Sequence, residues 1–362
     1  LAIFFVFITN SFKKNKTKDI SDFRIQKRTA LSLIPIFLLT VIVGSRLLGF
    51  DRDFEQYVEF YNEIGAGETS RFEFAFVLLG KIVQAFFGTG YSSLINLDFS
   101  FLVFLYIVAF ISISIKVYLL SKRSNFVALM VIYCLMLVPL QEMTQMRVGI
   151  ATAIMFLGIY HSSTKNLTIP QRLLYVILGL GFHQSTILLA PFILFSNQVK
   201  EFTLFKLLLG ISIPALALYF VILLAQNFTE TLYIIEYYTR PEIIELLNKP
   251  NPFSSRSLTL ITVLGIGLLN SRNLPSEAVP WFYVSIVGLA TFFGMMSIPV
   301  MAHRFLEMTL FANLMWVSFL PMIDRYICIS LLLLFALYSI YRTLFLSTMF
   351  GTTFCAPACL YW

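Results

Sequence analysis

Long apolar runs alternate with short polar segments along most of the chain. Several of these runs are about 17 to 23 residues long, which is the length that an α-helix needs to cross a hydrocarbon layer about 30 Å thick. They are too continuous for the short alternating strands of a membrane-spanning barrel. We therefore predict an all-α, polytopic integral membrane protein.

The composition supports this class. Of the 362 residues, 58% are hydrophobic and only 12% are charged, and the mean hydropathy is +0.83. A single soluble core cannot bury so much apolar surface, so lipid must cover the rest. The net charge of +7 comes mostly from basic residues that flank apolar runs, where they orient the protein and contact anionic lipid. Nucleic acid is therefore not expected as a partner.

Basic loops set the predicted topology, because short loops rich in Lys and Arg stay in the cytoplasm. The basic segment 13–28 and the basic pair at 122–123 are therefore predicted to be cytoplasmic. The run 29–48 leads outward and the run 99–119 leads back, so the chain between them makes no net crossing. Within it, the apolar stretch 74–87 is predicted to be an interfacial or re-entrant helix.

The stretch 172–196 has two possible interpretations. It is either one span or two short half-spans that meet at 182–185, where the polar residues HQST follow Phe182. We favour the broken hairpin, which places Arg304 on the same outer face as Arg147. A single span would place Arg304 on the opposite side. With the hairpin, the chain has about twelve membrane helices, some of them short or re-entrant.

We predict one membrane-embedded domain over residues 1–350. Its outer loops are predicted at about 44–98 and 226–256, and the tail 351–362 has no recognisable role. No internal repeat is visible, which disfavours a transporter built from two inverted halves.

Three arginines near the predicted outer face are candidates for anion binding, because charges at membrane depth are costly and usually functional. Arg147 opens a helix, and a helix N-terminus beside a guanidinium suits a phosphate or pyrophosphate. The alternative is an interfacial arginine that only reaches the headgroups. Arg304 and Arg46 suit the same role, although Arg304 has its own alternative, an ion pair with Glu307 that only holds helices together.

Acidic, aromatic and imidazole groups share the same predicted face. Asp51 and Glu73 are candidates for a general base that deprotonates a hydroxyl, and Tyr57 and Tyr61 for platforms that stack on sugars. The plain alternative is a solvated acidic loop. His183 interrupts an apolar stretch and is either catalytic or a hydrogen-bonded core residue.

Other catalytic signatures are missing from the sequence. It has no glycine-rich nucleotide motif, no HExxH and no nucleophile elbow, and its four cysteines show no metal-ligand spacing. We therefore expect neither a metal nor another cofactor.

Five segments in order resemble the EpsG-like branch of the Wzy-type O-antigen polymerases. They are GSRLLGFDRDFEQY, FEFAFVLLGKIVQ, QMRVGIATAIMFLGIYH, GLGFHQSTILLAPFIL and AHRFLEMTLFANL. The resemblance implies a GT-C-like membrane glycosyltransferase that needs neither a sugar nucleotide nor a metal. By position, the family's site residues correspond to Arg46, either Asp51 or Asp53, Glu73, Arg147, His183 and Arg304.

The implied reaction transfers a growing polymer from undecaprenyl pyrophosphate to the terminal sugar of a newly flipped repeat unit. It takes place at the outer face of the bacterial cytoplasmic membrane. The three arginines would bind the donor pyrophosphate, and Asp51, Glu73 or His183 would take the acceptor proton. Expected partners are membrane lipid and a chain-length regulator protein. The alternatives are a flippase for the same lipid-linked sugar, an O-antigen ligase and a structural scaffold.

Overall fold

The computed structural model describes most of the chain, over residues 32–46, 53–67, 72–88, 91–92, 97–165, 167–196, 251–296 and 299–342. Outside the described residues lie Asp51, the basic segment 13–28, the tail 351–362 and nearly all of the predicted outer loop 226–256.

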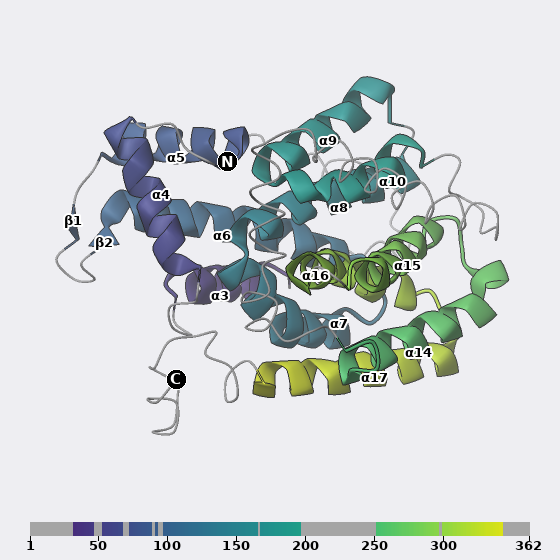
Figure 1. Ribbon diagram of the computed structural model, residues 1–362. Helices are drawn as coiled ribbons and strands as arrows, with labels where there is room; N and C mark the ends of the chain where they lie inside the picture. The colour runs from purple at the N-terminus through teal and green to yellow at the C-terminus, as the bar shows by residue number, and fades with distance from the viewer. Residues whose placement is uncertain are drawn as a thin grey trace.

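Helices make up nearly all of the described part (Figure 1). The first group comprises α3 (Leu33–Gly44), α4 (Phe54–Ala66), α5 (Phe74–Phe87) and α6 (Phe99–Ser121). The second comprises α7 (Phe126–Ile132), the π-helix η1 (Tyr133–Thr144), α8 (Met146–Thr164), α9 (Ile169–Phe182), the 3-10 helix η2 (Gln184–Leu189) and α10 (Ala190–Leu194). The third comprises α14 (Ser255–Leu269), the 3-10 helix η3 (Ser271–Asn273), α15 (Val279–Gly294), α16 (Pro299–Val317) and α17 (Met322–Tyr341).

Strand structure in the described part is limited to one antiparallel pair, β1 (Tyr91–Ser92) with β2 (Leu97–Asp98). The all-α prediction is therefore confirmed for these residues apart from this small pair. Three of the described helices are long and apolar enough to cross a membrane: α6, the continuous helix Phe126–Thr144 and α17. The number of about twelve spans and the GT-C-like architecture stay predictions.

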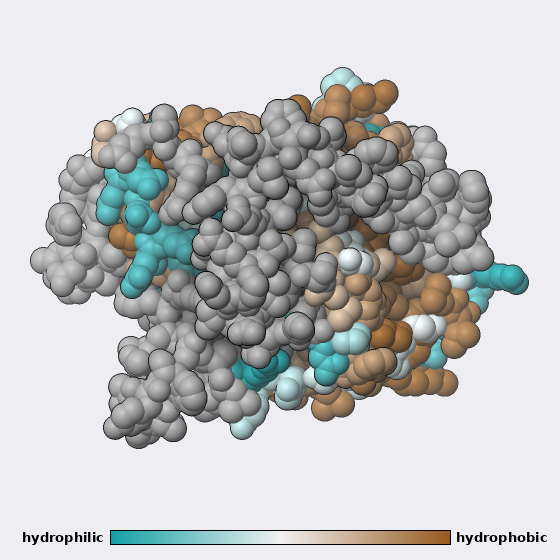
Figure 2. Space-filling model, in the orientation of Figure 1, coloured by the Kyte–Doolittle hydropathy of each residue, from teal (hydrophilic) through white to brown (hydrophobic). Residues whose placement is uncertain are grey.

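Exposed apolar side chains distinguish the helices on the outside of the bundle. In Figure 2, brown hydrophobic surface covers the lower right of the molecule, where α14 and α17 lie in Figure 1. Exposed large apolar side chains of these two helices include Leu258, Leu268, Leu269, Met322, Ile323, Ile327, Leu334 and Leu337. Such a surface is unfavourable in water and suits contact with lipid tails.

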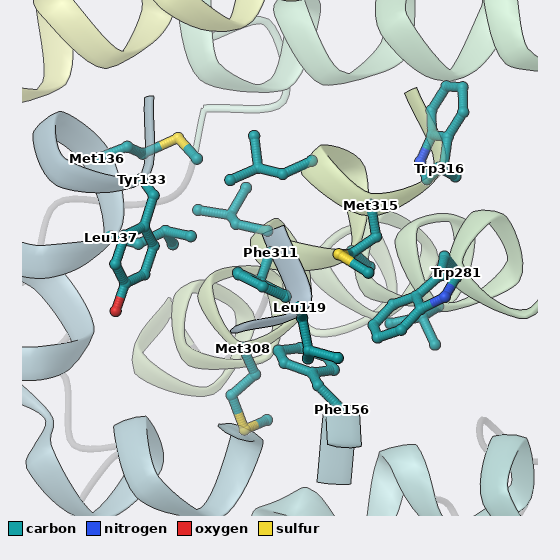
Figure 3. Close-up of a cluster of buried hydrophobic side chains, with 14 of the residues drawn as sticks. Leu119, Tyr133, Met136, Leu137, Phe156, Trp281, Met308, Phe311, Met315 and Trp316 are labelled. Atoms are coloured by element: carbon teal, nitrogen blue, oxygen red, sulfur yellow. The ribbon is translucent and has the colours of Figure 1, made fainter. Parts of the chain in front are cut away.

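A large aromatic core joins the second and third groups of helices (Figure 3). Phe311 of α16 lies between Phe156 of α8 and Tyr133 of η1, with ring centroids 5.1 and 6.2 Å away. The Phe156 ring also contacts Trp281 of α15. Because these rings are fully buried, they fix α8, α15 and α16 against one another through dispersion and apolar burial.

A second core holds the short helices α4 and α5 against α6. It is built on Phe60, Phe76, Phe101 and Phe104, all nearly or fully buried. The Phe60 and Phe76 rings stack with centroids 5.0 Å apart, and Phe104 meets Phe76 edge-on at the same distance. This core anchors the beginning of α5, which carries Glu73 as its N-cap residue.

The stretch after residue 168 forms a reversed pair of half-helices, as the broken-hairpin interpretation predicted. Helix α9 ends at Phe182, the backbone of the next residue, His183, is extended (φ −163°, ψ 119°), and the chain returns through η2 and α10. Arg172 at the start of α9 donates a 2.7 Å hydrogen bond to the main-chain oxygen of Leu194 at the end of α10. The two ends of the hairpin therefore lie together, and His183 lies at the turn.

The helix that begins at Phe126 continues beyond the apolar run 125–140 into the polar residues that follow it. The structure continues as η1 to Thr144. Pro139 has no N–H to donate, and the Thr144 hydroxyl donates to the Pro139 oxygen five residues back. This wide turn keeps Gln141 and Glu142 inside the helix and buried.

The contact between α15 and α16 gives a test of this packing. A Cβ added at Gly288 would lie 1.7 Å from Oγ1 of Thr309, whereas one added at Gly294 on the same helix would meet nothing within 4 Å. We expect Gly288→Ala to lower the free energy of unfolding by about 1–3 kcal/mol through overpacking. Thermal unfolding in detergent measures it. The matched control Gly294→Ala should unfold like the parent, and equal stability of the two variants would contradict this packing.

Candidate functional site

The carboxylate of Glu73 joins three segments that are far apart in the sequence. Its Oε2 accepts a 2.7 Å hydrogen bond from Nη1 of Arg147, at the start of α8. Its Oε1 lies 2.9 Å from Nδ1 of His183 at the turn of the hairpin, and 3.4 Å from the main-chain nitrogen of Gln184. The structure thus brings together Glu73, Arg147 and His183, three of the residues that the sequence singled out.

The hydrogen bond to Glu73 determines how His183 can act. A carboxylate only accepts hydrogen bonds, so Nδ1 of His183 is the donor. In the neutral imidazole, Nε2 is then left as an acceptor for a proton. The geometry is therefore that of a base oriented by a carboxylate.

Close helix packing brings Glu73 to His183. A Cβ added at Gly181, near the end of α9, would lie 2.7 Å from the Phe74 ring and 2.9 Å from Cβ of Ala75. A side chain at this position would therefore push the start of α5 away from the end of α9. The absence of a side chain at Gly181 allows the approach.

Glu73 is strongly acidic in this environment. Burial by itself raises the pKa of Glu73, but the hydrogen bond from His183 and the positive charges of Arg147 and His183 outweigh it and lower the pKa to about 2. The carboxylate therefore stays ionised at neutral pH. A group with so low a pKa is a poor general base, and Glu73 is better suited to orienting its two partners.

Arg147 has unused capacity to bind an anion. Its guanidinium stacks on the Phe72 ring at 4.2 Å and is partly exposed. Its Nε is buried, with no hydrogen-bond acceptor within the described part of the chain. Since a buried N–H without an acceptor is unfavourable, an oxyanion that reaches this group would be bound well.

Arg46 supports the segment that carries Arg147. Its guanidinium donates to the main-chain oxygen of Met143 and contacts the sulfur of Met146, 2.9 Å away. The side chain is only 5% exposed. Arg46 therefore lies beside the candidate site, with its charge directed at the turn between η1 and α8.

Tyr57 and Tyr61 belong to the aromatic core around α4. Their side chains are 4% and 1% exposed, and Tyr61 packs against the Phe101 and Phe104 rings. The Tyr57 hydroxyl donates to the main-chain oxygen of Thr144 at 3.5 Å. In this conformation neither ring has an open face for a sugar.

A second carboxylate, Glu307 of α16, lies across the same turn. Its Oε1 accepts from Nη1 of Arg256 at 3.0 Å and its Oε2 from Nε2 of Gln145 at 2.8 Å. The alternative of a pair between Arg304 and Glu307 is wrong in the described structure, because Arg256 takes that place. Arg304 lies one turn earlier on α16, half-buried, and makes no ion pair with the residues that the structure describes.

Three residues of this region were not among the candidates from the sequence: Arg256, Gln145 and the buried Lys116. Lys116 could have been found, because it is the only charged residue in the apolar run 99–121. Arg256 and Gln145 carried no such signal. Asp51 lies outside the described residues, and Asp53 precedes α4. Within the described ranges, no group of three or more His, Cys, Asp and Glu side chains could hold a metal ion.

Comparison with known proteins finds one family. A model of the EpsG family matches residues 29–357, which include every candidate residue named above. No curated protein and no solved structure matches the chain. The match confirms the resemblance seen in the five sequence segments.

The low pKa of Glu73 gives a pH prediction. Because its folded pKa is about 2 against an ordinary value of 4.5, its contribution to stability is complete above about pH 4.5 and is lost as the pH falls toward 2. We expect Glu73→Gln to destabilise the protein by about 1–3 kcal/mol at pH 7, and the difference to shrink at low pH. Thermal unfolding at several pH values measures it.

The exposed carboxylate Glu55 of α4 provides the control. Glu55→Gln should change the unfolding temperature little at any pH. A Glu73→Gln difference that stays constant from pH 7 to pH 2.5 would contradict the proposed environment of this carboxylate.

Proposed function

The chain belongs to the EpsG family, and from this premise we propose that it is a membrane glycosyltransferase that polymerises lipid-linked oligosaccharide repeat units. Its substrates are undecaprenyl-pyrophosphate-linked units, and its product is O-antigen or a related surface polysaccharide. The observation that carries the proposal is the contact of one carboxylate with both His183 and Arg147. This contact sets a proton acceptor beside a cation, as glycosyl transfer from a pyrophosphate requires.

His183 is the proposed general base. The acceptor hydroxyl attacks the anomeric carbon of the donor sugar and gives its proton to Nε2 of His183. The bond from that carbon to the pyrophosphate oxygen breaks, and undecaprenyl pyrophosphate leaves with both electrons. Glu73 holds the imidazole in the correct tautomer and stabilises its protonated form. Asp51 is the other base that the sequence offers.

Arg147 is the proposed partner of the leaving group. Its unsatisfied Nε and the first amides of α8 are suited to the growing negative charge on the pyrophosphate. Arg304, with no ion pair in the described structure, is proposed to add positive charge from α16. Arg46 acts by supporting the turn that carries Arg147.

The proposed enzyme works inside a membrane and on lipid-linked substrates. The enzyme lies in the bacterial cytoplasmic membrane with about twelve helices in a GT-C-like arrangement, and its site faces outward, where flipped repeat units arrive. Donor and acceptor are both lipid-linked, so membrane lipid surrounds the reaction, and a chain-length regulator protein is the expected partner. The proposed chemistry uses side chains and main-chain amides of this chain.

A gene deletion separates this function from its alternatives. Cells without the chain should carry lipid core capped by a single repeat unit, because flipping and ligation continue without polymerisation. Cores without any cap would instead favour a flippase or a ligase. An unchanged ladder of long chains would contradict all three functions.

Site variants expressed in the deletion strain test the residues. Arg147→Ala and His183→Ala should each reduce long-chain polysaccharide by about 100-fold or more at matched membrane levels. A gel of the polysaccharide measures this loss. The control is Arg272→Ala, at an exposed arginine of η3, and this variant should restore the full ladder. A full ladder from Arg147→Ala would refute its role at the pyrophosphate.

A further inference from the structure

A buried lysine on α6 takes no part in the proposed reaction. Lys116 is fully buried. Its Nζ donates to Oε1 of Glu142 at 2.6 Å and to Oε1 of Gln141 at 2.9 Å. The Tyr133 hydroxyl donates to the same Glu142 oxygen at 3.0 Å. These four residues form a polar cluster between α6 and η1, which we name the Lys116 cluster.

Holding two helices together does not require such a cluster. Removing a lysine and a glutamate from water costs several kcal/mol for each ion, and in membrane helices ionisable groups are rare for this reason. A well-packed apolar pair holds helices about as well. A buried pair in two candidate membrane spans therefore points to a further role.

The Lys116 cluster leads directly to the candidate site. Gln141, held by Lys116 at its side-chain oxygen, donates from its Nε2 to the main-chain oxygen of Glu307. Four residues later, Gln145 donates to the side chain of the same Glu307. Gln141 and Gln145 therefore both bind Glu307, the ion-pair partner of Arg256.

The first turn of α8 is seated on the same segment. A Cβ added at Gly149 would lie 2.8 Å from the main-chain oxygen of Gln141 and 3.1 Å from Oε2 of Glu142. Arg147 lies in this turn, only two residues before Gly149. A shift of Gln141 or Glu142 would therefore move the backbone that presents Arg147 to Glu73.

We propose that Lys116 is a positioning residue. It holds the segment from Gln141 to Arg147 in the position where this segment contacts the carboxylates of Glu307 and Glu73. Through Glu142 and Gln141 it sets the end of η1, so that Gln145 meets Glu307 while Arg147 meets Glu73. A displacement of about 1 Å at such a group is enough to reduce a rate about 100-fold. The inference rests on the proposed function, because it concerns the placement of the arginine that binds pyrophosphate.

The test removes both charges together, because Lys116→Met alone leaves an unpaired buried glutamate. The double variant Lys116→Met with Glu142→Leu is purified beside the parent and the control Lys165→Met, an exposed lysine at the end of α8. Unfolding temperature, binding of undecaprenyl pyrophosphate and polymerisation of a defined lipid-linked repeat unit are measured. We expect the double variant to unfold near the parent temperature, to bind undecaprenyl pyrophosphate at least about tenfold more weakly and to lose kcat/KM by at least as much.

Two results would overturn the role of Lys116. Parent-like binding and kinetics in the double variant would show that the charges are dispensable. A double variant that fails to accumulate folded would show that the cluster serves the fold. Failure of the proposed function differs from both, because the parent itself would then not extend the repeat unit.

Discussion

The candidate site depends on the carboxylate of Glu73. Each of its two oxygens accepts a hydrogen bond from a different partner, Arg147 or His183, and these two partners lie far apart in the sequence. One oxygen holds Arg147 at the beginning of α8, and the other holds His183 at the turn of the α9–α10 hairpin. The two contacts keep Glu73 ionised although it is largely buried. Without this charge, neither the tautomer of His183 nor the direction of Arg147 would be determined. The short helix α5, the glycine contact at Gly181 and the reversal of the hairpin all serve to bring these groups together.

The turn between η1 and α8 connects the carboxylate of Glu73 to a second carboxylate, that of Glu307. Gln145 and Arg147 lie on the same turn and contact Glu307 and Glu73 respectively. Arg46, which follows the end of α3, supports the turn from one side, and the Lys116 cluster supports it from α6. Donor and acceptor in the proposed reaction are each lipid-linked. A rigid segment between the two carboxylates can therefore hold the reacting ends of both substrates at a fixed distance and orientation.

Periodicity and charge in the sequence predicted the helical class, the break at His183 and the candidate residues Glu73, Arg147 and His183. These features can be recognised locally in the sequence, because burying a polar residue in an apolar run costs free energy and such residues are usually functional. Pairings between distant segments leave no such signal. The sequence therefore suggested Arg304 as the partner of Glu307 by its helical spacing, whereas tertiary packing supplies Arg256.

Burial was equally hard to infer. Tyr57 and Tyr61 are tyrosines in an acidic segment, but they pack in the aromatic core, whereas Glu55 and Glu59 of the same helix are exposed. The teal surface over α4 in Figure 2 shows that this outer side of the helix is hydrophilic.

The contacts of Glu73 are tested most directly by a double-mutant cycle of Glu73→Gln and Arg147→Gln on the free energy of unfolding in detergent. We expect a coupling of at least about 1 kcal/mol between the two substitutions, and additivity within about 0.5 kcal/mol would contradict the contact of Glu73 with Arg147.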